Sequence, residues 1–205
     1  MIRFTVGLRI WLVSMVACAT IVAFVFLRMD VTTALYFWNT DRPLSPLNRA
    51  FGARVILSAE AAAIIVMVLA RLVRGHIPVF GKTLVIACLA SMCAYVINDQ
   101  LLKAFCGVPN PTEVMHGAEH SFNLWMGSEN SSFPSGHMVL AGAFAGVFMR
   151  LHKVSIWPFA ALLLTAAGLL LVGDWHFPSD IIAGAFLGTS AGILAGEAWA
   201  AHSAR

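Results

Sequence analysis

Long apolar runs alternate with short polar segments along the whole chain. Six runs stand out, at residues 10–27, 55–70, 83–101, 137–151, 156–173 and 181–200. Several of them approach the ~20 residues that a helix needs to cross a bilayer, and helices are the open-chain structure that satisfies backbone groups in lipid. The pattern therefore predicts an all-α, polytopic membrane protein. We expect a six-helix transmembrane bundle that forms a single integral membrane domain over residues 1–205.

The composition excludes an ordinary soluble domain. Hydrophobic residues make up 60% of the chain and charged residues 11%, with a mean hydropathy of +0.82, whereas a soluble domain carries roughly 25% charged residues. Small residues recur in "LAGAFAGVF" and "IAGAFLGTSAGILAG" (residues 140–148 and 182–196), as in helices whose backbones pack closely. We expect the bilayer as the surroundings of the protein and no nucleic-acid partner. The pattern leaves the oligomeric state open.

The distribution of basic residues predicts the orientation in the membrane. With a cytoplasmic N-terminus, lysines and arginines are more numerous inside and acidic residues gather outside, which favours both termini in the cytoplasm. The inner set is Arg3, Arg9, Arg71, Arg74, Lys82, Arg150, Lys153 and Arg205, and the outer set is Arg28, Arg42, Arg49, Arg54 and Lys103. We therefore expect a protein of a bacterial-type inner (plasma) membrane whose site faces the periplasm. The first apolar run continues to Leu27, too far for a signal peptide, which predicts an uncleaved first helix.

Two short motifs place histidines at the outer ends of predicted helices. In "FPSGH", Pro134 suits the first turn of a helix, and the backbone N–H groups of Ser135 and Gly136 are expected to be free to bind an anion. His137 follows at a position from which it can protonate a leaving group. A plain helix start with a capping histidine is the alternative interpretation.

The second motif, "HFPSD", separates a histidine from an aspartate by four positions. Asp180 can accept a hydrogen bond from one ring nitrogen of His176, which leaves the other nitrogen as a base or nucleophile. Lys103 adds a cation at the outer end of the third apolar run. Taken singly, an interfacial His–Asp pair and a lysine that reaches the membrane surface are ordinary features.

Together, the three segments resemble the motifs of the type 2 phosphatidic acid phosphatase superfamily, the membrane lipid phosphate phosphatases. The family pattern is K-x6-R-P, then P-S-G-H, then S-R-x5-H-x3-D. Over about residues 95–195, the chain has Lys103-x6-Asn110-Pro111, then Pro134-Ser135-Gly136-His137, then Leu169-Leu170-x5-His176-x3-Asp180.

The resemblance implies a metal-independent phosphoryl transfer that needs no cofactor. It implies that His176 attacks phosphorus and forms a phosphohistidine while Asp180 holds its ring, and that His137 protonates the leaving oxygen. The residues implied to hold the substrate's other phosphate oxygens are Lys103, Ser135, Gly136 and, as a weak donor, Asn110. The expected reaction is hydrolysis of a membrane lipid phosphate or polyprenyl pyrophosphate at the outer membrane face. Two alternatives stay open: a lipid phosphotransferase, and a non-catalytic member that binds or transports a lipid phosphate.

The chain departs from the family pattern at the two arginines that clamp phosphate oxygens. Asn110 and Leu170 stand at these positions, and Leu169 replaces the serine. An amide offers a weaker contact than a guanidinium, and a leucine offers none. The residues considered as replacements are Arg42, Arg49, Arg54, His116 and His120.

Three further features have two interpretations each. His116 and His120 have the i, i+4 spacing of a metal-binding pair on a helix, but we interpret them as unspecialised loop histidines and expect no metal. Asp99, four residues before Lys103, either aims the lysine at the phosphate or forms a surface ion pair with it. Glu60 lies inside the second apolar run, where an acid usually has a partner or a function.

Overall fold

The computed structural model describes residues 2–40, 52–128, 130–152 and 156–204, and their side chains from residue 7 onward. Every regular element in these ranges is a helix, and none of the described residues forms a strand, which confirms the all-α prediction. The elements are α1 (Ile2–Arg28), α2 (Asp30–Trp38), α4 (Ala53–Arg74), α5 (Val79–Ile97), the π-helix η1 (Asn98–Leu102), α6 (Lys103–Cys106), α7 (Pro111–Met115), α8 (Gly136–Leu151), α9 (Trp157–Val172) and α10 (Pro178–Ser203).

Each predicted run corresponds to one long helix, but the helices differ in length. Four described segments are long and apolar enough to cross a membrane: Gly7–Arg28, Ala53–Arg74, Val79–Met115 and Pro178–Ser203. Helices α8 and α9 are apolar but have 16 residues each, about 24 Å of helix, which is less than the ~30 Å of a hydrocarbon core. The fold is compatible with a multi-pass membrane protein, while the predicted count of six crossings is not confirmed.

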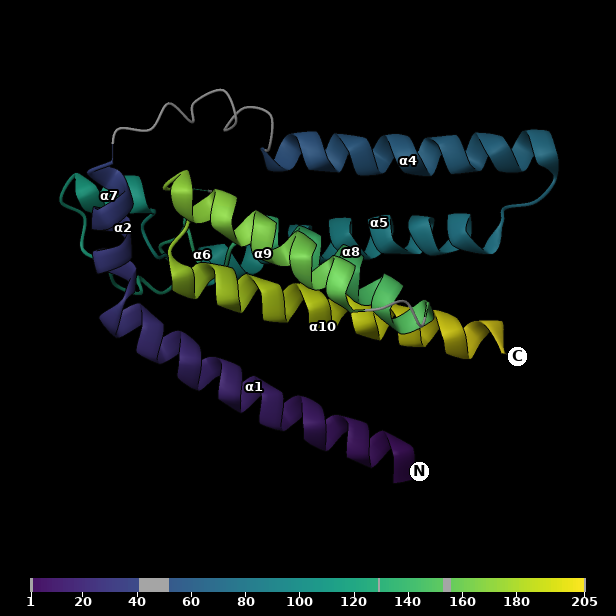
Figure 1. Ribbon diagram of the computed structural model, residues 1–205, viewed down its shortest axis with the longest axis horizontal. Helices are drawn as coiled ribbons and strands as arrows, with labels where there is room; N and C mark the ends of the chain where they lie inside the picture. Colours follow the sequence, from purple (N-terminus) through teal and green to yellow (C-terminus); the bar gives the residue numbers. More distant parts are fainter. Residues whose placement is uncertain (1, 41–51, 129, 153–155, 205) are drawn as a thin grey trace.

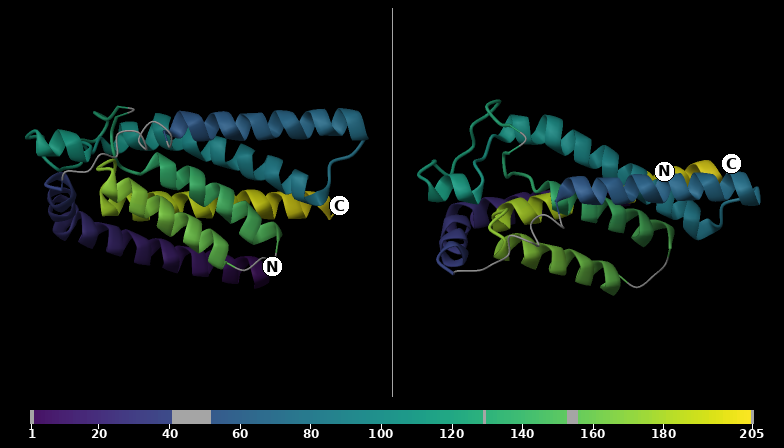
Figure 2. Two further views of the ribbon diagram at one scale, coloured as in Figure 1. Left: turned by 45° about the horizontal axis from the view of Figure 1, so that its top comes forward. Right: turned by 90° about the horizontal axis from the view of Figure 1, so that it is seen from above.

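The long helices run side by side along the longest axis of the molecule (Figure 1). The start of α1 and the end of α10 lie at one end, and the short helices α2, α6 and α7 gather at the other (Figures 1 and 2). Helix α2 turns sharply away from α1 and lies across this second end. Both described ends of the chain therefore lie opposite the region into which the motif segments fold.

Helix α8 lies at the centre of the packing, most extensively against α10 and next against α5. Glycines allow this close approach: a Cβ added to Gly146 would lie 2.6 Å from the carbonyl oxygen of Thr189, and Gly188 and Gly192 meet the backbone of α8 in the same way. Any larger side chain would push the two helices apart. Their outer ends, which carry the two histidine motifs, are thereby held next to each other.

The outer ends of α8 and α10 are also joined by hydrogen bonds. The Ser135 N–H, just before α8, donates to the Asp180 carbonyl in the first turn of α10 at 3.1 Å. Asn98 in η1 donates from Nδ2 to the Pro134 carbonyl at 3.1 Å. Three segments that are far apart in the sequence thus fix one another at the same end of the molecule.

The third predicted run contains an irregularity that hydropathy does not reveal. The α-helical pattern of α5 changes to the π-helix η1 at Asn98 and returns at Lys103. A π-turn inserts one extra residue and is frequent at functional sites. Here it directly precedes the buried Lys103 side chain, so it sets the direction in which that cation points.

Candidate functional site

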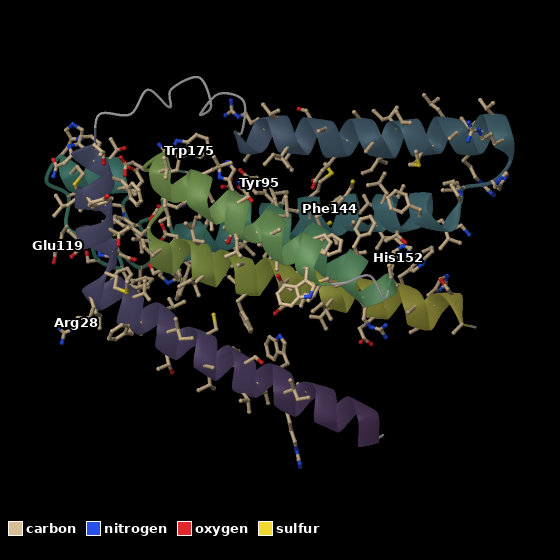
Figure 3. All side chains as sticks on the ribbon, in the orientation of Figure 1. Arg28, Tyr95, Glu119, Phe144, His152 and Trp175 are labelled. Atoms are coloured by element: carbon tan, nitrogen blue, oxygen red, sulfur yellow. The ribbon has the colours of Figure 1, made fainter. Side chains whose placement is uncertain are left out.

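A polar cavity of ≈ 570 Å³ opens where the three motif segments meet. It lies toward the end at which α2 and α7 gather: Figure 3 shows Trp175, one of its lining residues, on that side, and His152 toward the opposite end. The cavity is lined by Lys103, Asn110, Thr112, Glu113, Asn130, Ser131, Ser132, His137, Asp174, Trp175 and His176. Four of the residues singled out from the sequence, Lys103, Asn110, His137 and His176, therefore share one cavity.

The two motif histidines face each other across this cavity. Their ring centroids are 5.8 Å apart and the rings are nearly perpendicular, at 68°. The His137 ring also packs on Trp175, with centroids 5.1 Å apart. A single phosphoryl group bound in the cavity can lie beside both imidazoles at once, as nucleophilic attack and leaving-group protonation require.

Asp180 lies next to His176, as the spacing predicts. Its Oδ2 is 3.5 Å from His176 Nδ1, longer than a hydrogen bond, and the same oxygen accepts the Phe177 N–H at 2.8 Å. Asp180 is fully buried. Catalytic hydrogen bonds are often long in a structure without substrate, so this arrangement fits an aspartate that orients the ring when substrate is present.

His176 is neutral in these surroundings. Burial, and then the charge of Lys103, lower the pKa of His176 to about 3, while a hydrogen bond with the Ser132 backbone acts in the opposite direction. A neutral imidazole keeps a lone pair on one nitrogen, which a nucleophile or base needs. Lys103 is therefore close enough to influence the histidine and to meet an anion bound beside it.

Lys103 is the single Lys or Arg among the described residues that line the cavity. It is only 8% exposed, and its Nζ is 3.2 Å from Asp99 Oδ1. The predicted Asp99–Lys103 pair is thus present. Because both side chains are largely buried, the pair is not a surface ion pair, and it holds the ammonium group in place.

The first turn of α8 differs from the expectation in one respect. The Ser135 N–H is not free for an anion, because it donates to Asp180, and Ser135 Oγ accepts the Met138 N–H at 3.4 Å as the N-cap of the helix. The expectation of a free Ser135 N–H is therefore wrong: this group joins α8 to α10. Gly136 packs against Tyr95, whose Cε2 would lie 2.9 Å from an added Cβ. Neither Ser135 nor Gly136 lines the cavity, so substrate binding by Gly136 stays a prediction.

Asn110 lines the cavity but has a structural task. It is the N-cap of α7, with its Oδ1 accepting the Glu113 N–H at 3.0 Å and Glu113 Oε2 accepting the Asn110 N–H at 3.1 Å. Its Nδ2 donates to the Asn130 carbonyl at 3.4 Å. The sequence "NPTE" is a capping-box pattern with proline at N1, a signal that the motif comparison overlooked. The oxygen and the nitrogen of the Asn110 side-chain amide therefore both form hydrogen bonds within the protein.

The leucines at the other departures from the family pattern face apolar surroundings. Leu170 is 4% exposed and packs with Met138 and Ile181. Leu169 and Leu170 both line a second cavity, described below, and neither lines the polar one. No polar group thus replaces the missing arginine at position 170 itself.

The residues considered as replacements for the arginines do not line the polar cavity in the part of the chain that the structure describes. Arg54 is exposed in the first turn of α4, and Arg42 and Arg49 lie outside the described residues. His116 ends α7, where its Nδ1 donates to the Thr112 carbonyl at 2.7 Å. His120 packs between Phe26 and Phe177, at centroid distances of 4.1 and 4.4 Å.

A metal-binding role for His116 and His120 was considered because they would be one turn apart on a helix, and the structure does not have this helix. The two residues do not share a helix, because α7 ends at Met115 and His120 lies in a non-helical segment. No group of three or more His, Cys, Asp or Glu side chains that could hold a metal occurs among the described residues. Burial lowers the pKa of His120, and its ring packs against Phe26 and Phe177.

Asp30 is a residue of the site region that the sequence argument did not single out. It is fully buried at the start of α2 and accepts hydrogen bonds from the backbone N–H of Ser179, at 3.0 Å, and from the Ser179 hydroxyl. His120 Nε2 lies 3.5 Å from its Oδ2. Asp30 therefore caps the first turn of α10 from a different helix. Its partner Ser179 comes three residues after His176 and one residue before Asp180. Asp30 and Ser179 are 149 residues apart in the sequence, which leaves no local sequence signal for this contact.

A second cavity, also of ≈ 570 Å³, lies between α4, α5, α8 and α9. Its lining is almost entirely apolar and includes Ile56, Leu84, Leu140, Phe144, Leu162 and Leu170, with the acid Glu60 among them. His137 and Trp175 line both cavities. The polar cavity and this lateral cavity therefore share the His137 and Trp175 rings, which places a hydrocarbon-lined space beside His137.

Comparison with protein families agrees with the motif argument. The family model described as "PAP2 superfamily" matches residues 83–201, a segment that contains both cavity-lining histidines, Lys103 and Asp180. Searches of curated proteins and of solved structures gave no significant match.

Proposed function

The chain belongs to the PAP2 superfamily, and on that premise we propose that it is a membrane phosphatase that hydrolyses a lipid phosphate or a polyprenyl pyrophosphate. Family membership supports a phosphatase in general. The observation that carries the finer proposal is the pair of facing imidazoles, 5.8 Å apart, at the junction of a polar and an apolar cavity.

The proposed reaction has two steps. Nε2 of His176 attacks phosphorus, the bond from phosphorus to the leaving oxygen breaks, and His137 donates a proton to that oxygen. Water then attacks the phosphohistidine, His137 takes a proton from the water, and inorganic phosphate leaves with His176 restored. In the reacting state Asp180 accepts the Nδ1–H, and Nε2 exchanges its contact with the Ser132 backbone for the attack on phosphorus. Lys103 stabilises the charge on the oxygens that do not leave.

The junction of the two cavities supports an amphiphilic substrate. The phosphate fits the polar cavity, next to Lys103 and the histidines, and a hydrocarbon chain fits the lateral cavity, whose lining is apolar. A hydrocarbon chain can enter such a cavity from the bilayer at little cost, because its apolar lining resembles the lipid tails that the chain leaves. A site of this kind lets the substrate stay partly in the bilayer while its headgroup reacts.

The proposed orientation follows from the basic residues. The bundle crosses a bacterial-type inner membrane six times, α8 and α9 included, with both termini in the cytoplasm and the polar cavity at the periplasmic face. The two described chain ends lie opposite the short helices (Figures 1 and 2), which fits an even number of crossings. A reporter fused after Arg205 is expected to behave as cytoplasmic and one inserted near Glu119 as periplasmic; the reverse result would contradict the orientation.

The proposal is tested by phosphate release from a panel of lipid phosphates and polyprenyl pyrophosphates in detergent. We expect His176→Ala to lower kcat by at least about 10³-fold, as loss of a nucleophile does in other enzymes. His202→Ala is the matched control, because His202 is exposed in the last turn of α10, at the opposite end from α2 and α7, and is expected to leave kcat unchanged. Equal rates in wild type and His176→Ala would refute catalysis by this site.

A non-catalytic lipid-phosphate-binding protein is the second candidate. It is favoured by one observation, that Lys103 is the single Lys or Arg among the described lining residues of the polar cavity. It predicts that wild type binds lipid phosphates without releasing phosphate. A phosphotransferase, the third alternative, uses the same residues and differs by passing the phosphoryl group to a second lipid or sugar, so that labelled phosphate appears in a new lipid rather than in solution.

A further inference from the structure

We propose that Glu60 is a specificity residue of the lateral cavity, where its carboxyl group accepts a hydrogen bond from a hydroxyl or amide N–H of the lipid close to the phosphate. This inference rests on the proposed function and names the class of substrate: a lipid phosphate with a hydrogen-bond donor near its headgroup. Monoacylglycerol phosphates and sphingoid phosphates carry such donors, whereas a diacylglycerol phosphate, whose other hydroxyls are esterified, and a polyprenyl phosphate carry none.

Glu60 is an acid in an apolar setting without full compensation. It lies in α4, is 7% exposed and lines the lateral cavity between hydrocarbon side chains such as Leu84 and Leu140. Its Oε2 is buried and has no hydrogen-bond partner among the residues that the structure describes. An unpaired buried carboxyl group is costly in a protein and more so in a membrane. A hydrogen-bond donor on a bound ligand would pair with this oxygen and offset the cost of burying it.

Ser91 in α5 is hydrogen-bonded to the Glu60 carboxyl group, and its hydroxyl also lies 3.1 Å from the Leu140 carbonyl. A hydroxyl has one proton to donate, so Ser91 cannot satisfy both acceptors at once, and Oε2 of Glu60 has no partner among the described residues. The side chain of Glu60 therefore keeps an acceptor for a donor that comes from within the cavity.

The Ser91–Leu140 bond also fixes the depth of Glu60 relative to the reacting centre. Leu140 is three residues after His137 on α8, and both line the lateral cavity. Three residues of α-helix correspond to a rise of about 4.5 Å. Because Ser91 joins Glu60 to this position on α8, we infer that the Glu60 carboxyl group meets the lateral cavity about one helical turn beyond the histidine proposed to protonate the leaving oxygen.

That depth selects the part of a lipid that Glu60 can contact. A leaving oxygen at His137 places the next few atoms of the substrate one turn into the lateral cavity. In a monoacylglycerol phosphate these atoms include the free hydroxyl at the second carbon, and in a sphingoid phosphate they include an amine or amide N–H and a hydroxyl. In a polyprenyl phosphate they are hydrocarbon, which would leave the carboxyl group unpaired and desolvated.

The test uses two substrates that differ by one hydroxyl: a 1-acyl-glycerol 3-phosphate and the matching 1-acyl-propanediol 3-phosphate, which lacks the hydroxyl at the second carbon. Phosphate release by the full chain in detergent gives kcat/KM for each. We expect wild type to prefer the hydroxyl substrate by about tenfold, because a site built to pair with a hydroxyl discriminates against the analogue without it. A polyprenyl phosphate should behave like the deoxy analogue.

Two variants assign the preference to Glu60. Glu60→Gln retains a carbonyl acceptor and should keep the preference, whereas Glu60→Leu should abolish it and bring the ratio close to one. Leu84→Ala, at a neighbouring apolar lining position, should lower both rates by the same factor. A preference that survives in Glu60→Leu, or a wild-type ratio of one, would overturn the proposal.

A binding measurement separates this inference from the proposed function. If wild type releases no phosphate from any substrate, hydrolysis fails, and Glu60 is then judged by the affinity of phosphonate analogues with and without the hydroxyl. A tenfold preference in binding that Glu60→Leu removes supports the specificity role, and equal affinities refute it. If Glu60→Leu does not elute as a folded monodisperse protein, Glu60→Met takes its place, because its flexible side chain fits irregular apolar space.

Discussion

The two cavities that meet at His137 and Trp175 have similar volumes and opposite character. The polar cavity holds both histidines and one cation, Lys103, but lacks a guanidinium among its described lining residues. The lateral cavity is lined by hydrocarbon, with Glu60 as its single described acid. The difference indicates how an enzyme can work with a single cation beside the phosphate. Contacts between the protein and the hydrocarbon chain, remote from phosphorus, can orient the reacting centre and lower the barrier of the reaction. In the proposed mechanism the polar cavity carries the reaction at phosphorus, and the lateral cavity binds the hydrocarbon chain.

The largest effect is expected at the polar cavity. Lys103→Ala should lower kcat/KM by about 10²–10³-fold, the loss seen when one group that stabilises transition-state charge is removed. Lys103→Met keeps the length of the side chain without its charge and should be equally impaired, which separates charge from packing. A change of less than threefold in both variants would mean that another cation, outside the described cavity lining, binds the phosphate.

The next effect is expected at the lateral cavity. Ala141→Trp places a large ring among its lining residues and should lower kcat/KM for a long-chain phosphate by about tenfold or more, because the chain loses apolar burial. A phosphate ester with a chain of about four carbons, measured in the same preparations, should be affected far less. Equal losses for both substrates would indicate that the hydrocarbon chain binds elsewhere.

The state of His176 predicts a pH dependence of stability. Its folded-state pKa of about 3 lies below the ordinary value of 6.5, so between these values the unfolded chain binds a proton that the folded chain does not. The free energy of unfolding should therefore decrease as the pH falls from about 6.5, by at most about 1.4 kcal/mol per pH unit from this residue.

His176→Gln removes this contribution, and thermal unfolding of both proteins in detergent at pH 4 to 7 measures the difference. The comparison is needed because Asp30 acts in the opposite direction: burial first, then the nearby Asp180, raise its pKa to about 7, against hydrogen bonds from Ser179. Asp30 therefore favours the folded state at low pH and loses that contribution as the pH rises. If the stability of wild type and of His176→Gln changes with pH in the same way, the pKa of His176 is the same in the folded and the unfolded protein, which would contradict the prediction.

The smallest effect is expected at Asn110. Asn110→Ala should lower the free energy of unfolding by about 1 kcal/mol, because α7 loses its N-cap, with less than a threefold change in KM. Asn110→Asp retains the capping oxygen and should restore most of the stability. A large rise in KM at unchanged stability would instead make Asn110 a phosphate ligand, as the motif comparison suggested.

The sequence predicted the helices and the pairing of His176 with Asp180 because both depend on local signals, namely apolar runs and a spacing of four residues. The meeting of three distant motifs in one cavity was expected from the family resemblance and from their places at the outer ends of predicted helices. The family match over residues 83–201 confirms the resemblance that these motifs carry. The number of membrane crossings was less predictable, because α8 and α9 have only 16 residues each. A helix of this length does not show by its sequence alone whether it crosses the bilayer.

The features that the sequence argument missed depend on contacts between distant segments. The Ser135 N–H is used by Asp180, and Ser179 is capped by Asp30 from α2; neither pair has a local pattern. The π-helix before Lys103 has no hydropathy signature. Glu60 was noticed as an acid in an apolar run, but its place beside the reacting centre follows only from the packing of α4, α5 and α8.

The most direct test of the account is to trap the covalent intermediate. A lipid phosphate carrying radioactive phosphorus is mixed with the detergent-solubilised protein, the reaction is stopped in alkali within the first turnover, and the labelled peptide is identified by mass spectrometry. The account predicts a label on His176 that is stable to base and lost in acid, absent from His176→Ala, and more abundant in His137→Ala when the leaving group needs no proton. Release of phosphate without any label on His176, or the same label in His176→Ala, would contradict it.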